Sequence, residues 1–388
     1  MSRAYLDHAS TVPLRPVARE AMVAALTDLT GDPGRIHEEG LASRVALEQA
    51  REQVAALLGA RSREVVFTSG ATEAIAAAVH GAADRSRTRG LVDDEGRTHQ
   101  VVTAVEHSAV RFDAERSGAV TVVPVDGHGR VEADAVLDAI RPETALVHVQ
   151  WGNHEVGTVQ PVAEVVSACR ERGVLVHVDA AQAAGRVPIA FDELGADLLS
   201  ISGHKLGGPA GTGALLVRRG LRLAPLLLGG DQERARRAGL EPVAALVGLG
   251  AAAQELTGTL LAEAERSAEQ AQRIRTAVAD LDGVTPFGDP HHRLPHLVCV
   301  GIDGVEPQGV LLGLDRAGIA AHSGSACATE SLEPSPVLAA MGVDAHRSLR
   351  MSVGWSTTDA DIDRLLAALP VTIDHLRALG ASLADGSG

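Results

Sequence analysis

One residue of this sequence differs from all the others in its chemistry. Lys205 is the only lysine among the 35 basic residues, and every other basic residue is an arginine. A guanidinium stays protonated and is a poor nucleophile, whereas a lysine amine can lose its proton and attack a carbonyl group. Composition alone leaves a chance surface lysine as an equal alternative. Whether Lys205 is reactive must therefore be judged from the residues around it.

An acidic residue is predicted to lie beside this lysine. The β-branched run Leu175–Val178 is followed directly by Asp179, and the run Leu198–Ser202 is followed by His204 and Lys205. If the two runs are adjacent strands, a carboxylate and an amine share one edge of a sheet. Pyridoxal phosphate needs both groups, a lysine for its aldehyde and an acid that keeps its ring nitrogen protonated. Taken alone, Asp179 is more often a helix cap, but together with Lys205 it indicates a site for this cofactor.

The phosphate of such a cofactor requires free backbone amides, which the start of a helix provides. The segment 68–73 (TSGATE), which contains Ala71 and Thr72, joins a predicted strand to an alanine-rich helix. Helix caps of this kind are common, but the position at the first strand-to-helix turn of the sheet favours a phosphate site. The other candidate contacts are Ser202 and His204 to the phosphate, Gln182 to the phenolic oxygen and His107 stacked on the ring. For His107, a buried position in the core without contact to a ligand is the alternative.

The elements that position these residues follow from the pattern of the chain. Short β-branched runs alternate with helical stretches, which predicts an α/β fold whose mostly parallel sheet is covered by helices on both faces. From Pro242 to Leu281 we expect one long helix or a broken pair, followed by a smaller α/β unit. We expect a large cofactor-binding domain at residues 15–255 and a small domain of residues 1–14 and 256–388. The predicted strands of the large sheet are Val65–Thr68, Val101–Val105, Ala119–Val123, Ala145–Gln150, Leu175–Val178, Leu198–Ser202 and Ala214–Val217.

The composition is that of a globular protein, with 388 residues, 45% hydrophobic and 22% charged. A formal charge of -15 disfavours direct binding to nucleic acid or anionic membranes, and 2% aromatic residues leave few side chains for base stacking. No uninterrupted apolar run reaches ~18 residues, so we expect no membrane span. The N-terminus lacks the apolar region of a signal peptide. The three cysteines form no metal or redox motif, which fits a reducing cytosol.

Eight motifs, in order along nearly the whole chain, resemble those of the cysteine desulfurases, which are pyridoxal-phosphate enzymes of fold type I. The motifs are YLDHAS (5–10), FTSGATE (67–73), EHSAV (106–110), NHEVG (153–157), HVDAAQ (177–182), SGHK (202–205), SGSAC (323–327) and SLRMSVG (348–354). The resemblance implies that Lys205 forms the Schiff base, that Asp179 pairs with the pyridinium and that His107 stacks and transfers protons. It also implies cofactor contacts from Ala71, Thr72, His154, Gln182, Ser202 and His204, and substrate contacts from Asn153 and from Arg350, whose planar fork suits a carboxylate.

Cys327 looks like the nucleophile that accepts sulfur as a persulfide. It lies in the glycine-, serine- and proline-rich segment 322–336, which predicts an exposed loop in which a thiol can ionise. Cys169 and Cys299 fall in a helical and a strand pattern, and we expect them to be structural. The length of the segment resembles that of the family's long-loop subgroup, whose cysteine carries sulfur outward to a partner.

Two positions depart from the pattern of the family. His154 stands where the family normally has an asparagine that bonds the phenolic oxygen, and an imidazole donates a similar bond but is bulkier and titrates near neutrality. Leu240 stands where the family usually has a threonine that reaches the phosphate of the neighbouring subunit. Leucine cannot make that bond. Neither departure changes Lys205, Asp179 or Cys327, the residues expected to form the Schiff base, to pair with the pyridinium and to accept the sulfur.

The expected activity is conversion of L-cysteine to L-alanine, with sulfur passing to Cys327 and then to a protein acceptor, either an iron–sulfur scaffold or a sulfurtransferase. The resemblance implies a homodimer and leaves the destination of the sulfur open between iron–sulfur clusters, thionucleosides and, in one branch, DNA phosphorothioation. One alternative is selenocysteine lysis or transamination on the same scaffold, for which Cys327 would be dispensable. Another is an inactive sulfur-relay scaffold, which would show no absorbance from bound cofactor.

Overall fold

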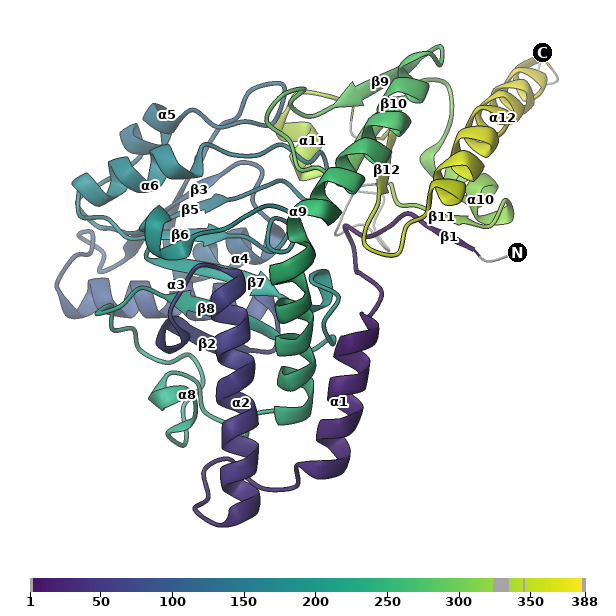
Figure 1. The fold of residues 1–388 in the computed structure, drawn as a ribbon. Coiled ribbons are helices and arrows are strands. Elements are labelled where there is room, and N and C mark those ends of the chain that lie inside the picture. Colours follow the sequence, from purple (N-terminus) through teal and green to yellow (C-terminus); the bar gives the residue numbers. More distant parts are fainter. Residues whose placement is uncertain (1–2, 324–334, 345, 386–388) are drawn as a thin grey trace.

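The computed structural model describes residues 3–323, 335–344 and 346–385. Its centre is a seven-stranded sheet with helices on both faces (Figure 1). The strands are β2 (Val65–Thr68), β3 (Thr98–Thr103), β4 (Gly118–Val123), β5 (Thr144–Gln150), β6 (Val176–Asp179), β7 (Leu198–Ser202) and β8 (Gly213–Val217). They lie in the order β2-β8-β7-β6-β5-β3-β4, and every neighbouring pair is parallel except the two that include β8. The predicted α/β fold with a mostly parallel sheet is confirmed.

The strand β3 lies earlier in the chain than the hydrophobic pattern predicts, at Thr98–Thr103 instead of Val101–Val105. Its first half is polar but buried, and hydrogen bonds satisfy most of its side-chain groups, Gln100 Nε2 being without a partner among the described residues. The ring of His99 bonds to Thr144 Oγ1 (2.8 Å) and to Thr121 Oγ1 (2.9 Å). A strand whose buried polar groups are paired in this way is missed by a search for apolar runs.

Two groups of helices cover the sheet. One face carries α3 (Ala71–Thr88) and α4 (Ser108–Ser117), and the other carries α2 (Glu38–Leu57), α5 (Ala133–Asp138), α6 (Val162–Glu171) and α9 (Val243–Ala279). Side chains of a strand alternate between the faces, so in β5 Leu146 packs with α3 and Val147 packs with the other group. Small side chains one turn apart let α3 lie close to the sheet, namely Ala74, Ala78 and Ala82.

A smaller unit is built from both ends of the described chain. Its sheets have the orders β12-β10-β9 and β1-β11, and one hydrophobic cluster joins them to the end of α9. Its elements are β1 (Ala4–Tyr5), β9 (Val284–Phe287), β10 (Leu297–Ile302), α10 (Pro307–Arg316), β11 (Ile319–Ala320), α11 (Pro336–Ala340), β12 (Ser348–Ser352) and α12 (Asp359–Asp385). Because α9 continues without a break across residues 255 and 256, the division into residues 15–255 and residues 1–14 with 256–388 stays a prediction.

Two long helices near the N-terminus are not among the predicted elements. Both α1 (Pro16–Asp28) and α2 pack along α9 (Figure 1). Their patterns are hard to recognise because apolar side chains also point to solvent, among them Val23, Leu26, Leu41 and Val45. The remaining short elements are two 3₁₀ turns, Ser62–Glu64 and Gly203–Lys205, and the helices α7 (Phe191–Leu194) and α8 (Gln232–Ala235).

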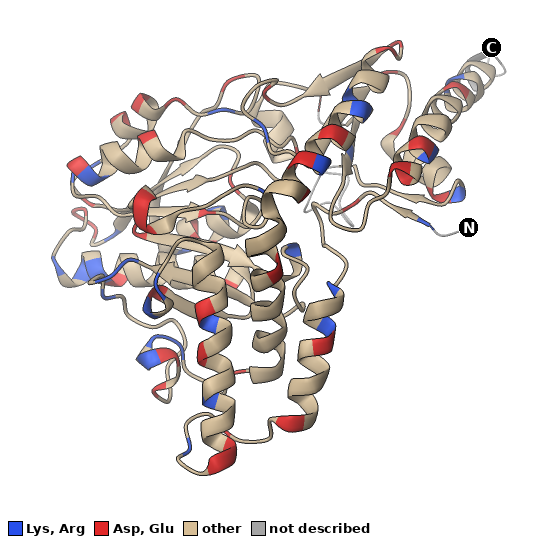
Figure 2. Cartoon of the chain, viewed as in Figure 1, with Lys and Arg blue, Asp and Glu red and all other residues tan. Residues whose placement is uncertain are grey.

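The helix α9 is the single long helix that the sequence offers as one of two possibilities. By length and composition alone it is apolar enough to cross a membrane, although no uninterrupted apolar run predicts a span. In the structure Leu246, Leu249 and Leu256 of α9 are buried in the core. Its C-terminal half carries many charged side chains (Figure 2). Core helices pass the same test of length and hydropathy, so this feature is weak evidence for a membrane.

Candidate active site

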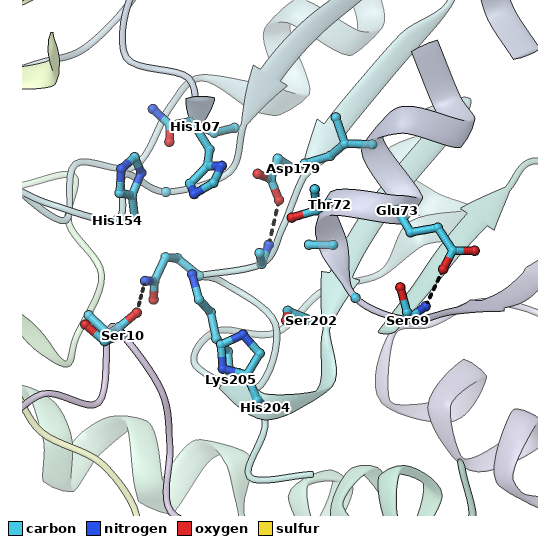
Figure 3. A pocket seen from close by; sticks show the side chains of 18 of the residues that line it. Ser10, Ser69, Thr72, Glu73, His107, His154, Asp179, Ser202, His204 and Lys205 are labelled. Carbon is cyan, nitrogen blue, oxygen red and sulfur yellow. Dashed lines mark hydrogen bonds between the residues drawn. The ribbon is translucent and has the colours of Figure 1, made fainter. Parts of the chain in front are cut away.

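A cavity of about 400 Å³ opens where β5, β6 and β7 end. The carboxyl ends of parallel strands meet at one edge of a sheet, which brings Gln150, Asp179 and Ser202 into its wall. The start of α3, the N-terminal segment and β12 complete the wall. Ten predicted site residues line this cavity, several of which are labelled in Figure 3: Ala71, Thr72, His107, His154, Asp179, Gln182, Ser202, His204, Lys205 and Arg350.

Lys205 reaches the cavity from the 3₁₀ turn that directly follows β7. Burial lowers the pKa of its amine to about 8, with Arg350 and Arg186 acting in the same direction and Asp179 opposing them. A substantial share of the amine is therefore unprotonated near pH 8, as a nucleophile requires. The chemistry expected from the sequence, an amine that can attack a carbonyl group, is supported by these surroundings.

Asp179 is the last residue of β6 and lies across the cavity from Lys205 (Figure 3). Its Oδ1 accepts hydrogen bonds from Ala181 N (3.0 Å) and Ser200 Oγ (3.1 Å). Its Oδ2 has no hydrogen-bond partner among the residues that the structure describes. One oxygen thus orients the carboxylate, and the other is available to a protonated nitrogen in the cavity.

The start of α3 forms an anion cradle. Its N-cap is Gly70, and no side chain caps the helix. The amides of Ala71, Thr72 and Glu73 have no acceptor in the described part of the chain, as is usual for the first turn of a helix. Close approach requires glycine here, since a Cβ on Gly213 of β8 would lie 2.6 Å from Gly70 Cα. Such unpaired amides at a helix N-terminus bind phosphate well.

His107 and His154 form one wall of the cavity. Their rings meet edge to face with centroids 5.3 Å apart. His107 also caps α4, because its Nδ1 accepts a hydrogen bond from Ala109 N (3.1 Å). Burial lowers the pKa of His107 to about 4, and His154 acts in the same direction. His107 is therefore neutral at pH 7, and since Nδ1 accepts a bond, its proton is on Nε2.

Arg350 of β12 is 2% exposed and is held by residues distant in sequence. Its Nη1 donates to His154 O (2.8 Å), and its Nη2 donates to Asp7 Oδ1 (3.0 Å) and Ser10 Oγ (2.6 Å). Its Nε has no acceptor within the described ranges. The guanidinium is thereby fixed in the cavity wall as a permanent positive charge.

The N-terminal segment also orients two of the predicted cofactor ligands. Gln182 Nε2 donates to Ala9 O (2.6 Å), and His204 Nδ1 bonds to Thr11 Oγ1 (3.1 Å). Ser202, in contrast, has no side-chain hydrogen bond to any residue that the structure describes. Its hydroxyl is free to bind a ligand.

Of the two remaining predicted site residues, one is not brought to the cavity and the other lies outside the described residues. Asn153 is buried beside it, and its side chain donates to Val105 O (3.2 Å) and accepts from Glu155 N and Val156 N (2.8 Å each). These bonds give Asn153 a structural part and leave direct substrate contact without support in the geometry. Cys327 lies outside the described residues, five positions after His322, which lines the cavity.

The cavity also contains residues that sequence reasoning did not single out. Ser10 and Glu73 belong to motifs that carry the family resemblance, so the signal was present but was not assigned to a side chain. Gln150 ends a predicted strand at the correct edge, and His322 begins the segment that carries Cys327. These four side chains share one cavity only because segments distant in sequence pack together.

A further acid, Glu106, lies behind the wall formed by His107. Its Oε1 accepts hydrogen bonds from Thr103 Oγ1 and Gln150 N (2.8 Å each), and its buried Oε2 has no partner among the described residues. Burial raises the pKa of Glu106 to about 8, and the charge of Asp179 contributes in the same direction. Glu106 is thus largely protonated at pH 7 and joins the end of β3 to the end of β5.

We expect the stability difference between the wild type and Glu106→Gln to depend on pH. The pKa of about 8 in the folded protein lies above the ordinary glutamate value of 4.5, so the stabilising contribution of Glu106 is complete below about pH 4.5 and is lost as the pH rises through about 8. At about 1.4 kcal/mol per pKa unit, the unfolding free energy of the wild type should fall by roughly 3 kcal/mol relative to that of the variant between pH 5 and pH 8. Urea unfolding at both pH values measures this, and an equal pH dependence of the two proteins would contradict it.

These groups fit pyridoxal phosphate. The unpaired amides of α3 and the free hydroxyl of Ser202 suit a phosphate, and Asp179 Oδ2 suits a protonated pyridine nitrogen. The amine of Lys205 has the lowered pKa that combination with an aldehyde requires. His107 offers a neutral planar ring at the same cavity. All of these groups line one space of about 400 Å³, which is of the size usual for cofactor sites.

Comparison with known proteins agrees with this geometry. The family model described as aminotransferase class-V matches residues 4–365. A cysteine desulfurase of Trichormus azollae is 41% identical over 400 residues, which cover 100% of this chain and 97% of the relative.

Solved structures are similar over the same length. A structure described as a NifS-like protein aligns with a TM-score of 0.87 and 28% identity, covering 96% of this chain and 100% of that one. A structure described as SspA in complex with cysteine aligns with a TM-score of 0.79 and 31% identity, covering 90% and 99%. The chain therefore belongs to the class-V aminotransferase family and, within it, to the cysteine desulfurases.

Proposed function

We propose that this protein is a pyridoxal-phosphate-dependent cysteine desulfurase that converts L-cysteine to L-alanine and retains the sulfur as a persulfide. The observation that carries the proposal is the placement of Lys205 and Asp179 on adjacent strand ends, with Arg350 in the same cavity wall. Relatives named cysteine desulfurase match over the full length of the chain, which supports the same reaction.

The residues of the cavity divide the binding of the cofactor among them. Bound pyridoxal phosphate supplies a carbonyl group for an amine and a protonated ring that withdraws electrons from the carbon next to it. Lys205 would hold the carbonyl carbon, and Asp179 Oδ2 would keep the ring nitrogen protonated. The amides of Ala71 and Thr72 and the Ser202 hydroxyl would hold the phosphate. His107 would stack on the ring, and His154 and Gln182 would bond to the phenolic oxygen.

The proton on the substrate's α-carbon is assigned to Lys205. His107 accepts a hydrogen bond at Nδ1 from the backbone of Ala109, so the neutral ring presents a proton donor, Nε2, to the cavity. Lys205, with a pKa lowered to about 8, is free to accept a proton once the substrate amine has replaced it. The geometry therefore favours Lys205 as base and His107 as donor at the opposite side.

The substrate carboxylate is assigned to Arg350. Its Nε faces no acceptor in the described part of the chain, and its charge is held in place by Asp7. A charge-assisted bond from a guanidinium orients a carboxylate well, because both groups are planar. This contact would leave the thiol of the substrate free to point away from Arg350.

We assign the sulfur-accepting thiol to Cys327. The thiolate attacks the sulfur of the substrate, the carbon–sulfur bond breaks, and its electron pair passes to the carbon, which takes up a proton and becomes the methyl group of alanine. L-Cysteine and one thiol thus give L-alanine and one persulfide, and no external oxidant or reductant is needed. The described cysteines Cys169 and Cys299 do not suit this step, because burial raises the pKa of their thiols to about 11 and about 12.

The test is incubation of the purified protein, loaded with pyridoxal phosphate, with free L-cysteine. We expect equimolar alanine and protein-bound sulfur in the first turnover, and sulfide when a thiol reductant is added. Formation of a keto acid in place of alanine would contradict the proposal and indicate transamination.

The assembly and the acceptor are further parts of the proposal. We propose a homodimer, because α1, α2 and the connection between them expose several apolar side chains, Ile36 being 93% exposed. Sedimentation equilibrium distinguishes the homodimer from a monomer of 40.1 kDa.

We further propose that a protein acceptor takes up the persulfide sulfur in a reducing cytosol. Iron–sulfur cluster assembly, thionucleoside synthesis and DNA phosphorothioation are the alternative destinations.

A further inference from the structure

The loop after β8 is held in an unusual conformation. Glu233, Arg234 and Ala235 have positive φ angles of 48°, 59° and 60°. The left-handed region is unfavourable for residues with a Cβ, so strong contacts must hold the loop. The buried carboxylate of Glu233 supplies them, since it accepts two bonds from Arg51 (2.6 and 2.7 Å) and one from Phe67 N (2.8 Å). The loop is thus anchored to β2, the strand that leads into the anion cradle.

This anchored loop reaches the cradle through Arg237. The guanidinium of Arg237 donates to Glu73 from Nε (2.9 Å to Oε1) and from Nη2 (3.3 Å to Oε2). Glu73 Oε2 in turn accepts from Ser69 N (2.8 Å), as Figure 3 shows. Arg237, Glu73 and Ser69 therefore form a continuous chain of hydrogen bonds from the loop to the first turn of α3.

Glu73 presents an electrostatic conflict that this chain of bonds resolves. Glu73 lines the cavity within the first turn of α3, and its carboxylate bonds to Ser69 N at the edge of the turn where the proposed cofactor places its phosphate. Burial acts to raise the pKa of Glu73, but hydrogen bonds from Arg237 and Ser69 outweigh it and lower the pKa, so Glu73 is charged at pH 7. Two like charges repel each other strongly in a partly buried site. The positive charge of Arg237 lies in direct contact with Glu73 and offsets this repulsion.

The same loop lacks the polar side chain with which the family usually reaches the phosphate of the neighbouring subunit. Leu240, three residues after Arg237, is 62% exposed and has no side-chain donor. Within this chain, the contact from the loop to Glu73 of the cradle is made by Arg237.

We propose that Arg237 is a positioning residue that sets the affinity for the cofactor's phosphate, by neutralising Glu73 and by holding it on the amide of Ser69. The inference rests on the proposed function, because it takes pyridoxal phosphate as the ligand of the cradle. It assigns to an arginine outside the cavity a role that acts on the phosphate and leaves the ring and the aldehyde unaffected.

The experiment compares the binding of two ligands to the apo-protein. Dissociation constants for pyridoxal phosphate and for pyridoxal, which lacks the phosphate, are measured by the absorbance of the bound ligand. For Arg237→Ala we expect roughly ten- to hundredfold weaker binding of pyridoxal phosphate, since about 1.4 kcal/mol of uncompensated repulsion corresponds to each factor of ten. Binding of pyridoxal should change by less than about twofold, since the aldehyde and ring contacts are unchanged.

A second variant separates charge from loop structure. In Glu73→Gln/Arg237→Ala both charges are absent, and the amide oxygen can still accept from Ser69 N, so we expect affinity for pyridoxal phosphate within about threefold of the wild type. Glu73→Gln alone should bind as tightly as the wild type or more tightly. The matched control is Arg234→Ala on the same loop, whose ion pair with Glu48 is on the surface, and it should leave both affinities unchanged.

The outcomes are distinct. Equal weakening in Arg237→Ala and in the double variant, or equal weakening for both ligands, would overturn the proposal and leave Arg237 a merely structural residue. Tenfold weaker binding by Glu73→Gln alone would also overturn it, and this variant retains the anchored loop if Arg237→Ala does not fold. If the wild-type apo-protein binds no pyridoxal phosphate, the proposed function itself fails.

Discussion

Replacement of Lys205 by alanine is expected to abolish both the turnover of cysteine and the visible absorbance of bound pyridoxal phosphate. The chain has no other lysine, so no second side-chain amine can take its place. The loss of a group that both binds the carbonyl carbon and moves the proton should lower kcat on the order of a thousandfold or more. Absorbance spectra and alanine release measure the two effects.

The matched control is Lys205→Arg, which keeps a positive charge in the cavity that Asp179 also lines but not a titratable amine. We expect it to be as inactive as Lys205→Ala, because the guanidinium stays protonated. In the wild type the rate at which the apo-protein combines with the aldehyde should rise as the pH increases through about 8, because the amine loses its proton there. An unchanged visible spectrum in Lys205→Ala would show that the amine is not the point of attachment.

Replacement of Cys327 by serine is expected to leave the cofactor absorbance unchanged while turnover falls on the order of a thousandfold or more. A hydroxyl is far less nucleophilic than a thiolate and cannot hold sulfur as a persulfide. Alanine release from L-cysteine, together with labelling of protein-bound sulfur, measures the loss.

Cys169→Ala provides the control for the second prediction. Cys169 is buried in α6, and burial raises the pKa of its thiol to about 11, so its removal should leave turnover intact. Normal alanine release from Cys327→Ser, or loss of persulfide in Cys169→Ala, would reject the assignment of the nucleophile.

The centre of the site could be predicted from the sequence alone because it depends on local order. Asp179 and Lys205 each follow a recognisable strand, and neighbouring parallel strands always present their carboxyl ends at the same edge of the sheet. The start of α3 is likewise a local feature, a strand, a glycine turn and a helix in sequence. Wherever a side chain is placed by the strand that precedes it, periodicity and a residue's chemical type are sufficient.

Only the tertiary structure could decide which distant groups complete the site. Arg350 is held by Asp7, 343 positions away, and Glu73 is paired with Arg237, 164 positions away. Glu106 acquires its raised pKa from burial beneath two strand ends, which no local pattern reveals. Periodicity records whether a residue faces the core, but the partner of a buried charge is set by how separate segments pack, because electrostatic contact depends on distance in space.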